Sequence, residues 1–69
     1  MFEAGDLVQI NEQCVLKYFI NKLAIIRMNL GYDATDHGHG SYYMLHFSDG
    51  SEHVFCESEL DLISRVNKK

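Results

Sequence analysis

The sequence has no proline and no tryptophan, and it has only two cysteines, Cys14 and Cys56. Two isolated cysteines are too few for the disulfide framework that stabilises small secreted domains, and they do not form a C-x-x-C pair. We expect both to be reduced, semi-buried, small apolar residues; a reactive thiol and a Cys14–Cys56 disulfide are the alternatives. With 46% apolar residues, four tyrosines and four phenylalanines, the composition is that of a folded core and excludes a disordered chain.

Lysine and arginine are absent from residues 33–64, although the whole chain carries a formal charge of −4. This stretch has seven acids, Asp33, Asp36, Asp49, Glu52, Glu57, Glu59 and Asp61. An acidic surface repels phosphate backbones and accelerates encounters with basic partners, so a basic protein is a better partner than nucleic acid. The alternative is an ordinary solubilising surface.

Long hydrophobic runs are also absent, because Lys17, Asn21, Lys22 and Arg27 interrupt the most apolar part of the chain. The first six residues include two acids and no base, which is not the pattern of a secretory signal. We therefore expect a cytoplasmic protein with no membrane segment. The 69 residues suit a single domain, which we place at residues 1–66, followed by a frayed basic tail at 67–69.

Short runs rich in β-branched and aromatic residues alternate with turn residues along the chain, a pattern typical of a small barrel. The sequence predicts strands at 7–10, 23–28, 41–47, 52–56 and 61–64, with a single 3₁₀ turn at 57–60. Asn21 is suited to the left-handed conformation just before the second strand. The glycine-rich stretch 31–40 is predicted to be an exposed loop.

Two connections need separate treatment. Residues 14–20 form an apolar run without a clear period, which we interpret as a long loop with Leu16 and Phe19 packed inward; a helical turn and a further strand are the alternatives. Residues 48–51 contain an Asp-Gly pair, which supplies the positive-φ positions of a tight hairpin turn.

The order of these parts resembles that of SH3-like small barrels. The resemblance lies in the opening Gly5-Asp6-x-Val8-x-Ile10, the central strand 22–26, the hairpin Tyr43-x-Leu45-x-Phe47-Ser48-Asp49-Gly50 and the closing segment 57–63. Similar parts occur in the stromal SH3-like subunit of photosystem I, the variable chain of ferredoxin-thioredoxin reductase, KOW-type domains and short accessory proteins of tailed bacteriophages. The resemblance implies an all-β barrel of about five short antiparallel strands. The acid-rich half departs from the basic RNA-binding surface of KOW-type domains, and the lack of tryptophan departs from proline-binding SH3 domains.

Alternation along the predicted hairpin separates its side chains into two sets. If Tyr43, Leu45 and Phe47 face the core, the other set faces outward. We expect an exposed patch there, since aromatic residues and methionine concentrate at protein interfaces. The predicted binding residues are Tyr42, Met44, His46, His53 and Phe55, with an acidic rim of Asp49, Glu52, Glu57, Glu59 and Asp61. The alternative is that a loop or a second copy of the chain covers this face.

The leading functional hypothesis is a small non-catalytic adaptor, of the bacteriophage accessory kind, that docks on a larger protein with a basic surface and modulates it. A second hypothesis is a nucleic-acid-binding barrel that uses Lys17, Lys22, Arg27 and the bases at 65–69. A third is a homo-oligomer, for example a homodimer, that pairs through an exposed strand edge.

Chemistry of other kinds has little support in the sequence. We expect no enzyme, because no nucleophile motif or phosphate-binding loop is present and a small barrel has little room for a substrate pocket. We expect no cofactor. Asp33, Asp36, His37 and His39 lie close together in one loop, with Asp36, His37 and His39 the candidate metal ligands, but a glycine-rich loop does not fix such ligands in place.

Overall fold

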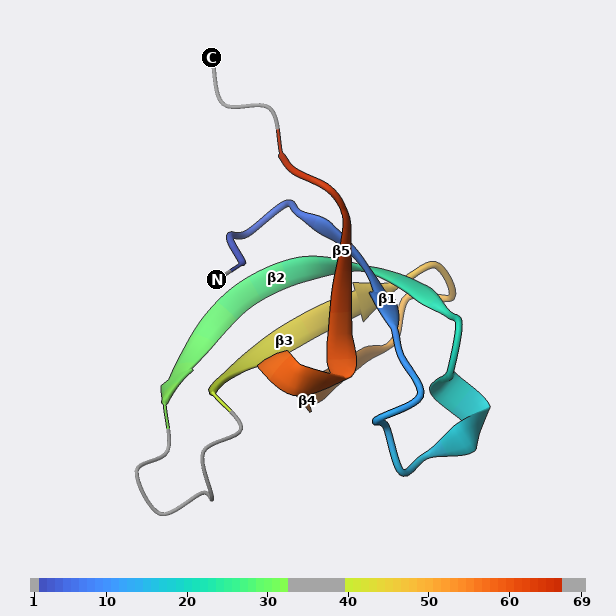
Figure 1. The fold of residues 1–69 in the computed structure, drawn as a ribbon. Helices are drawn as coiled ribbons and strands as arrows, with labels where there is room; N and C mark the ends of the chain where they lie inside the picture. The colour runs from blue at the N-terminus through green and yellow to red at the C-terminus, as the bar shows by residue number, and fades with distance from the viewer. Residues whose placement is uncertain (1, 33–39, 67–69) are drawn as a thin grey trace.

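The computed structural model describes residues 2–32 and 40–66, which form five antiparallel strands in one sheet and two 3₁₀ turns. In chain order the elements are β1 (Leu7–Ile10), η1 (Lys17–Phe19), β2 (Leu23–Tyr32), β3 (Ser41–Phe47), β4 (Glu52–Cys56), η2 (Glu57–Glu59) and β5 (Leu60–Ser64). The predicted all-β class, the five strands and the 3₁₀ turn before the last strand are confirmed (Figure 1).

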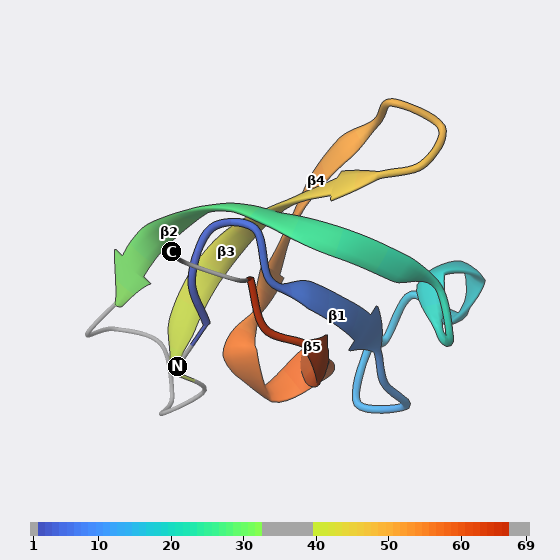
Figure 2. The same cartoon turned by 90° about the horizontal axis from the view of Figure 1, so that it is seen from above.

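The strand order in the sheet is β4-β3-β2-β1-β5. β2 is longer than predicted, because it continues through Gly31 and Tyr32, which we had placed in a loop. Two register shifts against β3, at Ile26/Met28 and Asn29/Gly31, interrupt its pairing. Such bulges bend a strand and increase its twist, so β2 curves from β1 to the far end of β3 and makes the sheet barrel-like (Figures 1 and 2). The rest of the predicted loop, 33–39, lies outside the described residues.

One hydrophobic core fills the concave side of this curved sheet. Alternate residues of each strand enter it, as the pleat of a strand requires. The predicted inward set on β3, Tyr43, Leu45 and Phe47, is confirmed, since each is at most 5% exposed. Each large side chain buried in this way contributes roughly 1.5–3 kcal/mol to stability. The other strand residues of the core are Val8, Ile10, Ala24, Ile26, Phe55 and Leu60.

The β3–β4 turn is tight, as predicted, but only one of its residues has a positive φ. Gly50 has a φ of 89°, whereas Asp49 keeps a negative one. The Gly50 N–H donates to the Phe47 carbonyl at 2.9 Å, and the Phe47 N–H donates to the Ser51 carbonyl at 2.9 Å. This is the three-residue hairpin loop that ends in a left-handed residue, and it sets the register of β4 against β3.

Residues 11–22 form the connection that the sequence left open, and it is a loop that contains the single turn η1. Phe19 is half-buried and packs against the core, as predicted. The prediction for Leu16 is wrong, because its side chain is 56% exposed. The Phe19 N–H donates to the Leu16 carbonyl, which forms the turn and points neighbouring side chains in different directions.

Asn21 has the left-handed conformation that was predicted, with a φ of 72°. Its N–H donates to the Ile10 carbonyl at 2.8 Å, which joins the end of the loop to β1. This conformation is strained for residues with a Cβ, and Asn and Asp tolerate it because their short polar side chains bond to the local main chain. We therefore expect Asn21→Ala to lower the free energy of unfolding by about 1 kcal/mol. Asn21→Gly should change it far less. Urea denaturation of both variants tests this, and equal losses would show that the side chain matters more than the backbone conformation.

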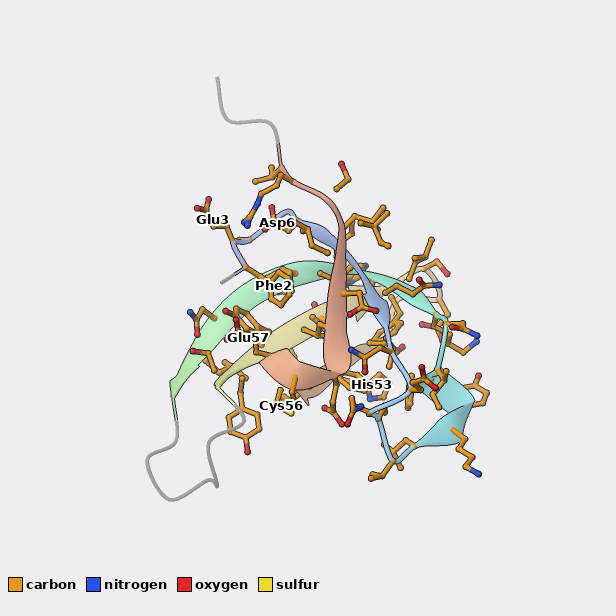
Figure 3. All side chains as sticks on the ribbon, in the orientation of Figure 1. Phe2, Glu3, Asp6, His53, Cys56 and Glu57 are labelled. Atoms are coloured by element: carbon orange, nitrogen blue, oxygen red, sulfur yellow. The ribbon has the colours of Figure 1, made fainter. Side chains whose placement is uncertain are left out.

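The two ends of the described chain meet at Asp6, whose side chain is fully buried. One carboxylate oxygen accepts from the Val66 N–H at 2.7 Å, and the other accepts from the Glu3 N–H at 2.9 Å and from Arg65 Nη1 at 3.3 Å. Figure 3 shows Glu3 and Asp6 together beside the last strand. A single acid therefore holds the segment before β1 and the segment after β5. The predicted tail at 67–69 lies outside the described residues.

Candidate functional site

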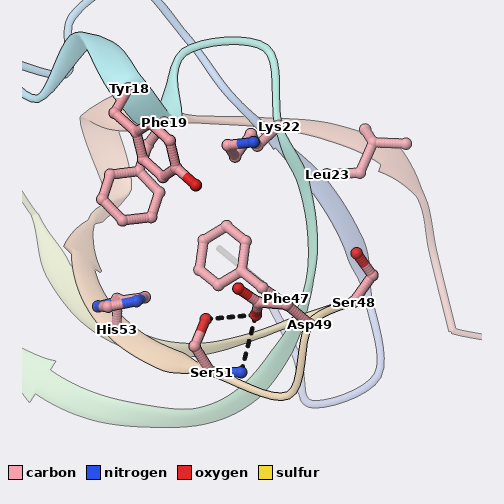
Figure 4. Close-up of a pocket in the computed structure, with 9 residues that line it drawn as sticks. All are labelled: Tyr18, Phe19, Lys22, Leu23, Phe47, Ser48, Asp49, Ser51 and His53. Atoms are coloured by element: carbon pink, nitrogen blue, oxygen red, sulfur yellow. Dashed lines mark hydrogen bonds between the residues drawn. The ribbon is translucent and has the colours of Figure 1, made fainter.

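An open groove runs between the β1–β2 loop and the β3–β4 hairpin (Figure 4). Its volume is about 600 Å³, which is in the range of ligand sites and more than we expected from so small a domain. Two chain segments far apart in sequence form its walls, and the folded loop around η1 is what brings them together. Its lining residues are Tyr18, Phe19, Lys22, Leu23, Phe47, Ser48, Asp49, Ser51 and His53.

Aromatic rings form the inner wall of the groove, and Phe19 is at their centre. The Phe19 ring centroid lies 5.5 Å from that of Phe47, 4.9 Å from that of His53 and 5.3 Å from that of Phe55. The contacts with His53 and Phe55 are edge-to-face and the contact with Phe47 is tilted, and all three spacings are those of favourable aromatic pairs. The wall is therefore rigid and apolar, because Phe47 and Phe55 are fixed in the core and Phe19 packs on both.

The outer wall is more exposed. Tyr18 is 74% exposed, and its ring lies edge-on to Phe19 at a centroid distance of 5.2 Å. Lys22 Nζ lies 4.7 Å from the centroid of the Tyr18 ring, within the range of a cation–π interaction. This contact holds the Tyr18 ring over the mouth of the groove even though the residue has little other packing.

One acid lies opposite Lys22 on the hairpin side of the groove. The Asp49 carboxylate accepts hydrogen bonds from Ser51 Oγ at 2.6 Å and from the Ser51 N–H at 2.9 Å. These bonds stabilise its charged form and lower the pKa of Asp49 below its ordinary value, so it is ionised at neutral pH. The rim thus offers one donor group, the Lys22 ammonium, and one acceptor group, the Asp49 carboxylate.

This arrangement suits an apolar side chain with polar atoms beside it. The aromatic wall excludes water from one side of an inserted group, and the two charged rim residues can bond to both the N–H and the C=O of a peptide. A small ion of either sign would be attracted by one rim residue and repelled by the other. The groove therefore fits a segment of polypeptide better than a small ion.

The predicted patch on the hairpin is divided between two faces of the sheet. Tyr42 and Met44 are half-buried and His46 is exposed, and all three lie on the outer face. Phe55 is only 4% exposed and faces the core, so its predicted exposure is wrong. The reason is the register, which pairs Tyr43 with Phe55 and Leu45 with His53, and directly paired residues share a face.

His53 is exposed, as predicted, but it lies on the inner side and belongs to the groove. Its ring centroid is 5.6 Å from that of Phe47. On the outer face the strand neighbours of Met44 are Met28 and Val54, which are 47% and 50% exposed. The outer face of β2, β3 and β4 therefore carries an apolar row of three residues, two of which we had not predicted.

The five predicted rim acids are in different places. Glu52 lies on the outer face, where its carboxylate is 3.3 Å from His46 Nδ1 and 3.7 Å from Arg27 Nε, and Asp49 borders the groove. The carboxylates of the remaining three acids accept hydrogen bonds elsewhere in the fold. Glu57 accepts from the Ser41 N–H, Glu59 from the Cys56 N–H and Asp61 from Asn11 Nδ2. Only Asp49 and Glu52 lie beside the hairpin, so the acids do not form one rim.

The basic residues of the nucleic-acid hypothesis are also dispersed. Lys22 lies over Tyr18, Arg27 pairs with Glu52 and Arg65 pairs with Asp6. Lys17 is exposed in η1. Phosphate binding depends on several free cations on one surface, and within the described residues these cations are separated and mostly beside acids or rings.

Both cysteines have free thiols, as predicted. Cys14 is buried in the core, and Cys56 is half-buried at the start of η2. Burial raises the pKa of the Cys56 thiol, so the thiol remains protonated at neutral pH. This favours an unreactive, structural cysteine over a reactive thiol.

The candidate metal ligands Asp36, His37 and His39 lie outside the described residues. Within residues 2–32 and 40–66, no three His, Cys, Asp or Glu side chains are grouped closely enough to bind a metal ion. The same part of the chain contains no helix with the length and hydrophobicity needed to cross a bilayer.

The groove residues Tyr18, Phe19, Lys22 and Leu23 were missed as a site, although Phe19 was expected to pack inward. The signal that could have identified them is the apolar run 14–20, in which adjacent aromatics cannot all enter a small core. Comparison of the chain with protein-family models, with curated proteins and with solved structures finds no match.

Proposed function

We propose that this protein is a non-catalytic protein-binding module, and that its groove takes one apolar side chain from an extended segment of a larger protein. The observation that carries the proposal is the aromatic inner wall of the groove, in which the half-buried ring of Phe19 and the exposed ring of His53 rest on the buried ring of Phe47. Aromatic anchors of this kind supply much of the free energy of binding at protein interfaces.

The charge of the protein supports a partner that is basic around the anchor residue. The chain carries a net charge of −4, and Asp49 borders the groove at its hairpin end. Opposite charge on a partner raises its association rate, whereas nucleic acid would be repelled. The partner segment would therefore combine one large apolar residue with lysine or arginine at its flanks.

The strand order supports an assignment to the SH3-like small barrels. β1 pairs with both β2 and β5, and a 3₁₀ turn precedes β5. The sequence resemblance to short accessory proteins of tailed bacteriophages supports the role of an adaptor that docks on a host or complex subunit and modulates it.

The proposal is tested with a displayed library of random peptides selected on the immobilised protein. We expect the enriched peptides to share an aromatic or large aliphatic residue flanked by basic residues. Tyr18→Ala should lower the affinity for a selected peptide by about tenfold, roughly 1.4 kcal/mol, because the outer wall of the groove is lost. Fluorescence anisotropy with the synthetic peptide measures this.

Val15→Ala is the matched control, since Val15 lies in the same loop, is 84% exposed and does not line the groove. It should bind within twofold of the wild type, a change of roughly 0.4 kcal/mol. Failure to enrich any peptide, or equal affinity of Tyr18→Ala and the wild type, would refute the groove as the binding site.

A further inference from the structure

Among the described strands β4 pairs with β3 alone, so it forms one edge of the sheet. Figure 2 shows β4 and its hairpin projecting from the margin of the domain. The three residues Glu52, His53 and Val54 are all exposed. The main-chain edge of β4 is distinct from the groove, to which this strand contributes only the side chain of His53.

The register shows which main-chain groups of β4 are free. In an antiparallel pair, hydrogen-bonded and non-hydrogen-bonded positions alternate. The Phe47 N–H donates to the Ser51 carbonyl, so Phe47 and Ser51 form a hydrogen-bonded pair. Every second pair along the ladder is then hydrogen-bonded as well, namely Leu45–His53 and Tyr43–Phe55. The main-chain groups of His53 and Phe55 therefore point at β3.

The main-chain groups of the alternate β4 residues, Glu52, Val54 and Cys56, point away from β3. The Cys56 N–H agrees with this, since it donates to the Glu59 carboxylate at 3.0 Å and not to β3. Glu52 and Val54 stand at even spacings from Cys56, so their main-chain groups point in the same direction. No hydrogen bond within residues 2–32 and 40–66 joins the main chain of Val54 to any segment other than β3. The Val54 N–H and C=O thus face outward at the centre of an unpaired edge.

The edge has few of the features by which proteins usually prevent edge pairing, Glu52 being its one charged residue. β4 contains no proline and no lysine, and its register against β3 runs from Glu52 to Cys56 without a bulge. A regular edge with free main-chain groups is a template for another strand. A five-residue strand is long enough for such pairing and short enough that the pairing alone would be weak.

The edge is self-complementary about Val54. If two copies pair antiparallel around this residue, Val54 of one copy lies opposite Val54 of the other and each donates to the carbonyl of its counterpart. Glu52 then lies opposite Cys56, so no like charges face each other. The apolar row Met28, Met44 and Val54 continues across the two-fold axis into the same row of the second copy.

We propose that two copies of this chain form a symmetric dimer by antiparallel pairing of their β4 edges about Val54. The contact is isologous, so it closes at two copies. Its area is limited to one short strand and the apolar row beside it, and the dimer is therefore concentration-dependent in the micromolar range.

Sedimentation velocity across a concentration series tests the proposal. The wild type should move from the 8.0 kDa of one chain to twice that mass as concentration rises. Val54→Pro should remain at one chain, because proline lacks the donated N–H; since that N–H does not bond to β3, the fold should survive, which circular dichroism checks. Val54→Thr keeps the N–H and should dimerise like the wild type.

A second variant covers the case in which the proline disturbs the strand. Val54→Lys keeps the N–H but sets two ammonium groups against each other at the two-fold axis, so it should also remain monomeric. A wild type that stays at one chain through the whole series, or a dimer that persists in both variants, overturns the proposal. Slower amide exchange at Val54 only after addition of a selected peptide would place a foreign strand at this edge and would likewise overturn the homodimer.

Discussion

Replacing Asp6 by alanine is expected to lower the free energy of unfolding by about 3 kcal/mol. The carboxylate is fully buried and accepts from the main chain of Glu3 and Val66 and from the side chain of Arg65. Alanine removes the buried acceptor of the two main-chain N–H groups, whereas the Arg65 side chain is 56% exposed and can be solvated. For a domain whose total stability is only about 5 kcal/mol or somewhat more, this is a large share. Urea denaturation followed by circular dichroism measures it.

Asp61→Ala is the matched control, because it removes an acid that is exposed and bonded only to the Asn11 side chain among the contacts described. It should change the free energy of unfolding by less than about 0.5 kcal/mol. Asp6→Asn retains the shape and one acceptor oxygen, so its loss should lie between the two. Equal stability of Asp6→Ala and Asp61→Ala would mean that the chain ends do not depend on this acid.

Phe19→Ala is expected to cost about 2–3 kcal/mol of stability. Phe19 is the one aromatic side chain of the β1–β2 loop that packs on the core, where its ring contacts those of Phe47, His53 and Phe55. Its loss would leave a cavity that the loop can only partly fill, since the Asn21 N–H still bonds to the Ile10 carbonyl. The expected cost is below that of a fully buried phenylalanine because Phe19 is half-buried.

Thermal denaturation of Phe19→Ala and of Tyr18→Ala, set beside the peptide affinity of each variant, separates effects on stability from effects on binding. Tyr18 is 74% exposed, so Tyr18→Ala should lose less than about 0.5 kcal/mol while it loses peptide affinity. Phe19→Ala should lose both. A Tyr18→Ala variant as unstable as Phe19→Ala would show that the outer wall supports the fold and would remove it as a selective test of the groove.

Local patterns were sufficient for the elements themselves. The β-branched run at β1, the alternating aromatics of β3 and the glycine of the hairpin turn each determine a conformation within a few residues, so their positions agree with the prediction. The inward orientation of Tyr43, Leu45 and Phe47 follows from the same alternation. Asn21 is another local case, since the residue type itself permits the positive φ.

The errors concern relations between segments. Phe55 was assigned to the wrong face because face depends on the pairing register, which the Gly50 turn and the ladder with β3 decide. Leu16 and Phe19 could not be separated because their directions depend on the η1 turn and on the core available beneath it. The acids were grouped by sequence, whereas Glu57, Glu59 and Asp61 follow β4 and bond to Ser41, Cys56 and Asn11, away from the turn at Gly50.

The sequence by itself therefore determined that the chain folds as a small all-β domain with five strands and an acidic balance, because composition and short-range periodicity contain that information. Only the tertiary structure decided where a partner can bind. The groove exists because a loop after β1 folds against a hairpin between β3 and β4, and the free edge exists because β4 is last in the sheet. Both are consequences of long-range pairing, which no short segment specifies alone.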